Sequence, residues 1–143
     1  MTLRVLLVDD HEMFRQAVSL SLAQAPGVQV VAEVADGAAA LAALAHSTPD
    51  VVCLDVNLPG QDGIELTRAL LARRPELRVI GLSAHADPLV VARMLHAGAM
   101  GYVSKSRVGQ DLQAAIHQVG QNQSYLGPDF DQRVALELMR LAR

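Results

Sequence analysis

The sequence predicts a doubly wound α/β fold, in which helices cover both faces of a parallel sheet. Five apolar runs of strand length recur along the chain, and segments with helical spacing separate them. The runs are almost continuously hydrophobic rather than alternating, as is typical of strands that are buried on both faces. A strict alternation of strand and helix, repeated five times, indicates this fold class.

The five predicted strands are rich in Val, Leu and Ile, which favour extended structure. They cover Leu3–Val8, Val28–Val34, Val51–Leu54, Leu77–Leu82 and Ala99–Val103.

The intervening segments carry helix signals. Asp87 at a predicted N-cap, Pro88 at the first helical position and Gly98 just past the end mark one helix. A helix from Asp62 must end before Pro75. The remaining helices are predicted over Glu12–Ala25 and Asp36–His46, and after the fifth strand, where apolar residues follow helical spacing at Val108, Leu112, Ala115, Ile116 and Val119.

Beyond these elements, the polar stretch Gly120–Pro128 contains Gly and Pro and indicates a linker. A sixth helix is predicted after it, with Phe130, Val134, Leu138 and Leu141 on one stripe. We therefore predict one domain over residues 1–121, and a linker with a C-terminal helix over residues 122–143.

Composition narrows the function classes. The 143 residues suit one domain, and the net charge of −3 disfavours a free-standing nucleic-acid binder. No apolar run approaches the roughly 18 residues of a membrane span, and the N-terminus lacks a signal-peptide pattern, so we expect a cytoplasmic protein. Cys53 is the single cysteine, and we expect a small buried hydrophobic residue rather than a ligand or a disulfide partner.

Polar side chains follow four of the predicted strands. Ligands of open α/β sheets bind at the carboxyl ends of the strands. Asp9 and Asp10 follow the first strand, Asp55 the third, Ser83 the fourth, and Ser104 with Lys105 the fifth. Lys105 is also the only lysine in the chain. Three carboxylates, the Ser83 hydroxyl and the Lys105 amine are therefore expected at one edge of the sheet.

These groups suit phosphoryl transfer. Carboxylates that lie close together repel one another unless they share a cation. Mg²⁺ takes one or two protein carboxylates and leaves positions for phosphate oxygens. An amine and a hydroxyl opposite the metal would neutralise the other phosphoryl oxygens, and one carboxylate could accept the group as an aspartyl phosphate.

Four motifs carry a resemblance to a known family: Val8–His11, Leu54–Gly60 with Asp62 and Gly63, Leu82–Ala84, and Gly98–Lys105. They resemble the receiver domain of bacterial two-component response regulators, over residues 1 to about 121. The Asp-Asp-His opening and the Gly-Ala-Met-Gly-Tyr stretch are similar to the NarL/FixJ subfamily, whose members usually add a LuxR-type helix-turn-helix domain. The resemblance implies a flavodoxin-like sheet of order 2-1-3-4-5.

The resemblance also implies residue roles. Asp55 would accept a phosphoryl group from a partner histidine kinase, and the chain would catalyse only its own phosphorylation and dephosphorylation. Asp9, Asp10 and Asp55 would hold Mg²⁺ with the backbone carbonyl of Asn57. Lys105 would pair with the phosphoryl group. Ser83 would hydrogen-bond it and signal to Tyr102, which we expect near the surface and free to turn inward.

Phosphorylation could also lead to a homodimer, with DNA bound only through a helix-turn-helix domain. No such domain follows Pro128 here, so we expect either a receiver fragment or a protein without that output domain. Many receivers have a cis proline after the lysine, whereas this chain has Ser106, which leaves the loop geometry open.

Two alternative functions fit the sequence less well. A haloacid-dehalogenase-like phosphatase has its nucleophile on the first strand and a second Asp two residues later, where this chain has Asn57. A phosphorylation-independent adaptor would lack the acidic pair Asp9 and Asp10, the acceptor Asp55 or the lysine Lys105, and all of these are present.

The five histidines show no metal-ligand pattern. We interpret them as surface or capping residues, with His85 the one expected nearest the site.

Overall fold

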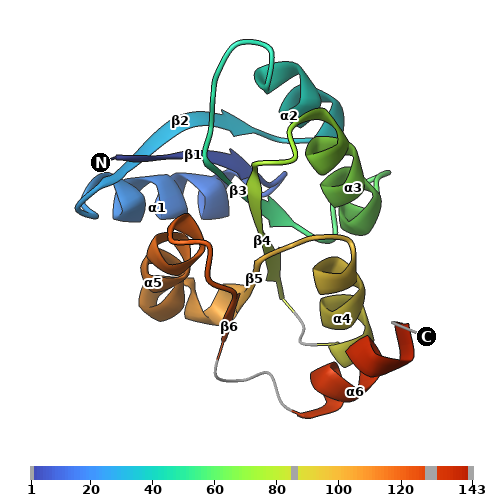
Figure 1. The fold of residues 1–143 in the computed structure, drawn as a ribbon. Helices are drawn as coiled ribbons and strands as arrows, with labels where there is room; N and C mark the ends of the chain where they lie inside the picture. The colour runs from blue at the N-terminus through green and yellow to red at the C-terminus, as the bar shows by residue number, and fades with distance from the viewer. Residues whose placement is uncertain (1, 85–86, 128–131, 142–143) are drawn as a thin grey trace.

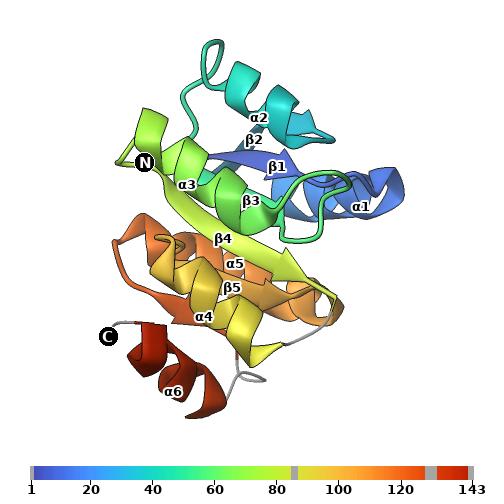
Figure 2. The ribbon, with the colours of Figure 1, turned by 90° about the vertical axis from the view of Figure 1, so that its right-hand side faces the viewer.

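One parallel sheet runs through the protein, with helices packed on both of its faces (Figures 1 and 2). The computed structural model describes residues 2–84, 87–127 and 132–141. The strands are β1 (Leu3–Val8), β2 (Val28–Val34), β3 (Val51–Asp55), β4 (Arg78–Ser83), β5 (Gly101–Ser104) and β6 (Tyr125–Leu126). The helices are α1 (Glu12–Ala23), α2 (Gly37–Ala43), α3 (Gly63–Arg73), α4 (Pro88–His96), α5 (Val108–Gly120) and α6 (Gln132–Leu141).

The strand order β2-β1-β3-β4-β5-β6 confirms the predicted doubly wound fold and the order of its first five strands. The sixth strand was not predicted. It lies inside the segment that the sequence indicated as a linker, where it pairs in parallel with β5. The N–H of Tyr125 donates to the Met100 carbonyl at 2.9 Å, and the N–H of Gly127 donates to the Tyr102 carbonyl at 3.2 Å.

The continuous hydrophobicity of the strands follows from the two helical layers. Along β1, Leu6 and Val8 join the buried cluster beneath α2, α3 and α4, whereas Val5 and Leu7 join the cluster beneath α1 and α5. Figure 2 shows α2, α3 and α4 on the near face and α1 and α5 behind the sheet. Every second residue therefore faces a different apolar layer.

Side-chain caps begin three of the helices. The carboxylates of Asp36, Asp62 and Asp87 accept from backbone N–H groups at 2.8, 2.8 and 3.0 Å at the starts of α2, α3 and α4. Pro88 is the first residue of α4, and Gly98 follows that helix with a φ of 115°, a conformation that favours glycine. The caps predicted around α4 are thus confirmed.

The C-terminal helix α6 lies against α4 (Figure 2). Val134 is 2% exposed and belongs to the same buried cluster as Val91 and Met94 of α4, and Leu138 packs against that cluster. Phe130, predicted on the same stripe, lies outside the described residues. The C-terminal segment is therefore an integral part of the packed fold on this side.

Cys53 lies fully buried in the centre of β3, as predicted. Burial raises the pKa of its thiol to about 12, which keeps it protonated. Among the described residues, no helix combines the length and apolar character needed to cross a bilayer.

Candidate functional site

The sheet register brings the polar strand ends together at one edge. Val8 pairs with Leu54, so that Asp9 and Asp10 follow β1 beside the end of β3 at Asp55. Asp55 pairs with Leu82, and Ser83 pairs with Ser104 at the ends of β4 and β5. Lys105 follows directly in a 3₁₀ turn over Lys105–Arg107.

Asp9, Asp55 and Lys105 form a buried ionic cluster. Both aspartates are 2% exposed, and the Lys105 side chain is 13% exposed. The Lys105 Nζ atom lies 2.9 Å from Asp9 Oδ2 and 3.1 Å from Asp55 Oδ2. Burial alone would lower the pKa of Lys105, but its hydrogen bonds to Asp9 and Asp55 outweigh that effect and raise the pKa above 10.5. The ammonium therefore offsets the repulsion between the two carboxylates.

The loop from β3 to α3 shapes the other side of Asp55. The backbone N–H of Asn57 donates to Asp55 Oδ1 at 2.9 Å. The loop is tied to the sheet by the N–H of Val56, which donates to the Leu82 carbonyl at 3.0 Å. Gly63 closes it, since its N–H donates to the Val56 carbonyl at 3.2 Å. One carboxylate oxygen of Asp55 thus faces a backbone donor and the other faces Lys105.

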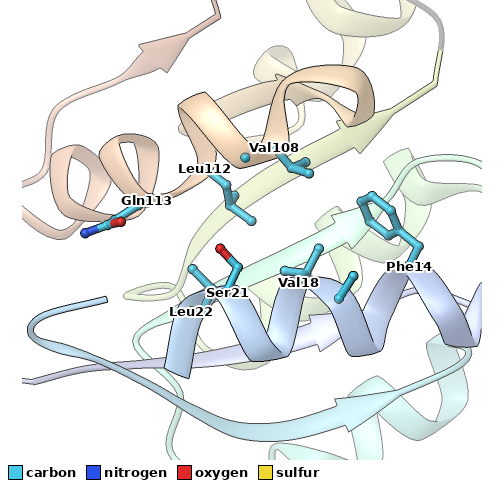
Figure 3. Close-up of a pocket in the computed structure, with 9 residues that line it drawn as sticks. Phe14, Val18, Ser21, Leu22, Val108, Leu112 and Gln113 are labelled. Atoms are coloured by element: carbon cyan, nitrogen blue, oxygen red, sulfur yellow. The ribbon is translucent and has the colours of Figure 1, made fainter. Parts of the chain in front are cut away.

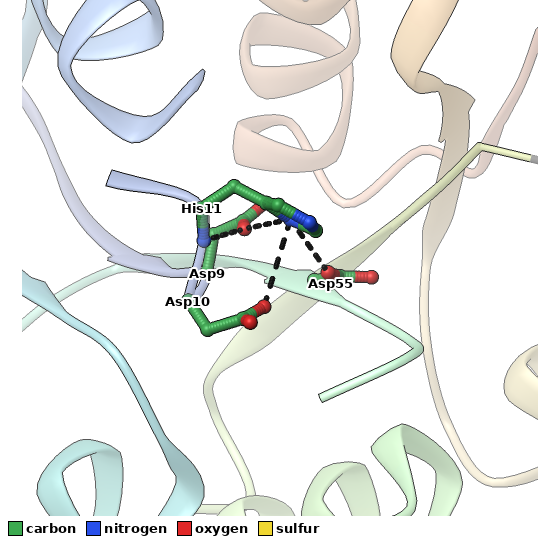
Figure 4. A group of neighbouring side chains, drawn as sticks. All are labelled: Asp9, Asp10, His11 and Asp55. Carbon is green, nitrogen blue, oxygen red and sulfur yellow. Dashed lines mark hydrogen bonds and ion pairs between the residues drawn. The ribbon is translucent and has the colours of Figure 1, made fainter. Parts of the chain in front are cut away.

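His11 belongs to the cluster, which the sequence interpretation missed. Its side chain is 64% exposed, but it makes no capping hydrogen bond at the start of α1. Its Nδ1 atom instead lies 3.1 Å from Asp9 Oδ1, 3.6 Å from Asp10 Oδ1 and 3.8 Å from Asp55 Oδ2 (Figure 4). The interpretation of His11 as a surface or capping residue is confirmed by its exposure. His85 lies outside the described residues.

The donor atoms of Asp9, Asp10, His11 and Asp55 all lie within 4.8 Å of one another, close enough to surround one metal ion. Carboxylate oxygens suit Mg²⁺, whereas imidazole nitrogen is a ligand that softer divalent ions prefer. The three carboxylates therefore fit Mg²⁺, and His11 is better described as a neighbour of that site.

Ser83 and Tyr102 lie next to this cluster. Ser83 is buried at the end of β4, and Tyr102 is 0% exposed in β5. Burial raises the pKa of Tyr102 to about 12; a hydrogen bond with Ser83 lowers it, and the charges of Asp87 and Asp55 raise it. The expectation that Tyr102 lies near the surface is therefore wrong, because its side chain is already turned into the core.

The loop after β5 adopts its geometry without a proline. Within the described residues every peptide bond is trans, including the one between Lys105 and Ser106. The Oγ atoms of Ser104 and Ser106 lie 2.9 Å apart and are hydrogen-bonded.

Phe14, in the first turn of α1, also reaches the cluster. The Lys105 Nζ atom lies over its ring, 4.6 Å from the centroid. On its other side Phe14 lines a groove of about 230 Å³ between α1 and α5 (Figure 3). The groove is otherwise lined by Ala17, Val18, Ser21, Leu22, Val108, Gly109, Leu112 and Gln113. Nothing in the local sequence pattern singled out Phe14.

Residues 5–117 match the profile of the response regulator receiver domain. The chain is 35% identical over 139 residues to the transcriptional regulatory protein DegU of Brevibacillus brevis, covering 97% of this chain and 59% of that protein. The chain spans about three fifths of the length of the curated relatives it matches.

Solved structures agree with this match. A two-component response regulator of the LuxR family from Aurantimonas sp. SI85-9A1 superposes with a TM-score of 0.87 at 33% identity, covering 99% of both chains. The isolated receiver domain of RcsB from Salmonella enterica serovar Typhimurium, determined in the presence of the phosphomimetic BeF₃⁻, gives a TM-score of 0.84 at 26% identity. That likeness covers 96% of this chain and 99% of the other.

Proposed function

This chain belongs to the response regulator receiver domain family, and from that membership we propose that Asp55 accepts a phosphoryl group from a partner histidine kinase. Receiver domains are signalling modules of two-component systems, so the chain is a signalling protein. The chemistry proposed for it is limited to its own phosphorylation and dephosphorylation.

The observation that carries the proposal is the environment of Asp55. Its carboxylate is buried at the ligand-binding edge of the sheet, with Lys105 Nζ 3.1 Å from Oδ2 and the Asn57 N–H bound to Oδ1. In the proposed step one carboxylate oxygen attacks phosphorus, and the bond from phosphorus to the kinase histidine breaks. Lys105 then pairs with the phosphoryl oxygens, whose charge it compensates.

Asp9, Asp10 and Asp55 would hold Mg²⁺, together with the Asn57 carbonyl that the family resemblance implies. When bound, Mg²⁺ neutralises phosphoryl oxygens and so eases the approach of the anionic acceptor. Asp9 presents its Oδ1 to His11 and its Oδ2 to Lys105, which fixes the orientation of this carboxylate.

Ser83 and Tyr102 would carry the signal away from Asp55. A phosphoryl group brings about −1.5 to −2 charge and strong acceptors, which would draw in the Ser83 hydroxyl. Because the Ser83 hydroxyl lowers the pKa of Tyr102 and so interacts with its phenol, a shift of Ser83 would change the packing of Tyr102 beside α4.

The output of the whole protein is also a proposal. Relatives described as a transcriptional regulatory protein and as a LuxR-family regulator support DNA binding through a helix-turn-helix domain of a longer protein. A phosphorylation-dependent homodimer and a cytoplasmic location are proposed with it.

The test compares Asp55→Asn with the parent protein, using acetyl phosphate and Mg²⁺ and intact-mass spectrometry. The parent should gain an acid-labile phosphoryl adduct and the variant should not, because an amide is not a nucleophile. Asp36→Asn is the matched control, since Asn caps a helix as well as Asp and Asp36 lies outside the site. An adduct at full yield in Asp55→Asn would refute the assignment, and no adduct in the parent would favour the adaptor function.

A further inference from the structure

The Lys105 ammonium is enclosed by polar groups on one side and by an aromatic ring on another. Asp9 and Asp55 lie at 2.9 and 3.1 Å, and His11 Nδ1 lies at 3.4 Å. The ring of Phe14 lies beneath the ammonium at 4.6 Å. A cation over an aromatic face is attracted by the negative charge density of that face.

The helix α1 presents these neighbours on one face. His11 precedes the helix, Phe14 lies three residues later and Val18 four residues after that, which is the spacing of side chains on one side of a helix. The Phe14 ring therefore faces the Lys105 ammonium, and the same side chain also lines the groove between α1 and α5.

The core holds the Phe14 ring in place. Phe14 packs against the buried cluster that includes Leu7, Val18 and Leu82, on the face of the sheet beneath α1 and α5. The lysine side chain, in contrast, has four rotatable carbon bonds and loses much rotamer freedom when it is fixed. A ring face that the core holds in place therefore restricts the positions that the Lys105 ammonium can take.

We propose that Phe14 is a positioning residue for Lys105, holding its ammonium beside Asp55 through the ring face. The inference rests on the proposed function, in which Lys105 pairs with the phosphoryl group. When a phosphoryl group arrives, Asp55 becomes the acceptor and Asp9 would hold Mg²⁺, so the interactions of both carboxylates with Lys105 change. The contact between Lys105 and the Phe14 ring stays the same. Phe14 thus keeps the ammonium within reach of the phosphoryl oxygens throughout the transfer.

The first test observes Lys105 directly. Because Lys105 is the only lysine, protein grown with ¹³C-labelled lysine gives one set of lysine side-chain NMR signals. Ring-current shielding should place the Lys105 ε-methylene protons upfield of a free lysine. Phe14→Leu should abolish that shift and Phe14→Tyr should retain it, since tyrosine keeps the ring face.

The second test measures function. Phosphorylation by acetyl phosphate should be about three- to tenfold slower in Phe14→Leu, with the rate restored in Phe14→Tyr. Val18→Ala is the matched control, because it removes buried apolar volume from the same face of α1, one turn farther from Lys105. It should leave the Lys105 signal and the rate at parent values.

The outcomes separate the two proposals. A parent protein that takes no phosphoryl group would overturn the proposed function and the role of Phe14 within it. A parent that is phosphorylated, with an unshifted Lys105 signal or with equal rates in Phe14→Leu, would overturn the role of Phe14 alone. A Val18→Ala variant as slow as Phe14→Leu would reduce that role to general packing and would also overturn it.

Discussion

Replacing Gly63 by alanine tests how tightly α3 is packed against the loop that follows Asp55. A Cβ atom built at Gly63 would lie 2.6 Å from the Val56 Cα atom and 2.8 Å from the Val56 carbonyl oxygen. Both are backbone atoms, so no side-chain rotation relieves the overlap. Either the start of α3 or the loop must move.

The expected loss of stability is about 1 to 2 kcal/mol. Overpacking a close contact costs about 1 to 3 kcal/mol. The higher helix propensity of alanine returns up to about 1 kcal/mol, less at the first position of a helix than in its interior. Gly109→Ala, in the first turn of α5, is the matched control because no atom outside its own stretch of helix lies within 4 Å of its Cβ position. That variant should be more stable than the parent by about 0.5 to 1 kcal/mol.

Urea unfolding followed by far-ultraviolet circular dichroism measures both changes. The loop also presents the Asn57 N–H to Asp55, so Gly63→Ala should slow phosphorylation whereas Gly109→Ala should not. If Gly63→Ala were as stable as the parent while Gly109→Ala gained stability, the close approach of α3 to Val56 would not constrain the fold. That outcome would refute a role of the Gly63–Val56 contact in shaping the loop after Asp55.

Three further predictions concern the side of the sheet away from α1. Val134→Ala should lower the free energy of unfolding by about 1.5 kcal/mol, because it removes two buried methyl groups. Urea unfolding measures this change, with Arg140→Ala as the control because Arg140 is exposed. Burial raises the pKa of Tyr102 from 10.0 to about 12. As the pH rises, Tyr102 therefore loses its proton in the unfolded chain before it does so in the folded protein. The free energy of unfolding should fall between about pH 10 and pH 12, by up to about 3 kcal/mol. Tyr102→Phe should remove that part of the fall in alkaline unfolding curves. Ser83→Ala should still accept a phosphoryl group. Beryllofluoride should, however, cause smaller amide NMR shifts over residues 87–105 in this variant than in the parent. Equal shifts would exclude Ser83 as the switch.

The sequence predicted the sheet and the convergence of polar strand ends because both depend on local patterns. Apolar runs define the strands, and the polar residue after each run marks the edge where ligands bind. The orientation of the Tyr102 side chain could not be predicted in this way. β5 is apolar on both faces, so its sequence pattern does not tell which side chains turn toward the site and which toward a core.

The contacts of His11 and Phe14 with the site were not predicted because they join residues that lie far apart in the sequence. Lys105 lies 94 residues from His11, and only the packing of α1 beside the loop after β5 brings them together. The strand β6 was not predicted for another reason. Its two residues are too few to form an apolar run, and it is extended because β5 offers it hydrogen-bond partners.

The strand β6 has a further consequence for the outer rim of the sheet. Tyr125 and Gly127 satisfy the carbonyls of Met100 and Tyr102, which would otherwise face outward from β5. An open strand rim of this kind is a template on which another chain can add its own strand. A protein shortened after Gln121 would expose that rim together with the apolar face of α4 that α6 covers, and it should self-associate into aggregates as its concentration rises. Tyr125 of β6 and the neighbouring Gly127 thus occupy the hydrogen-bonding positions that a strand from another chain would need.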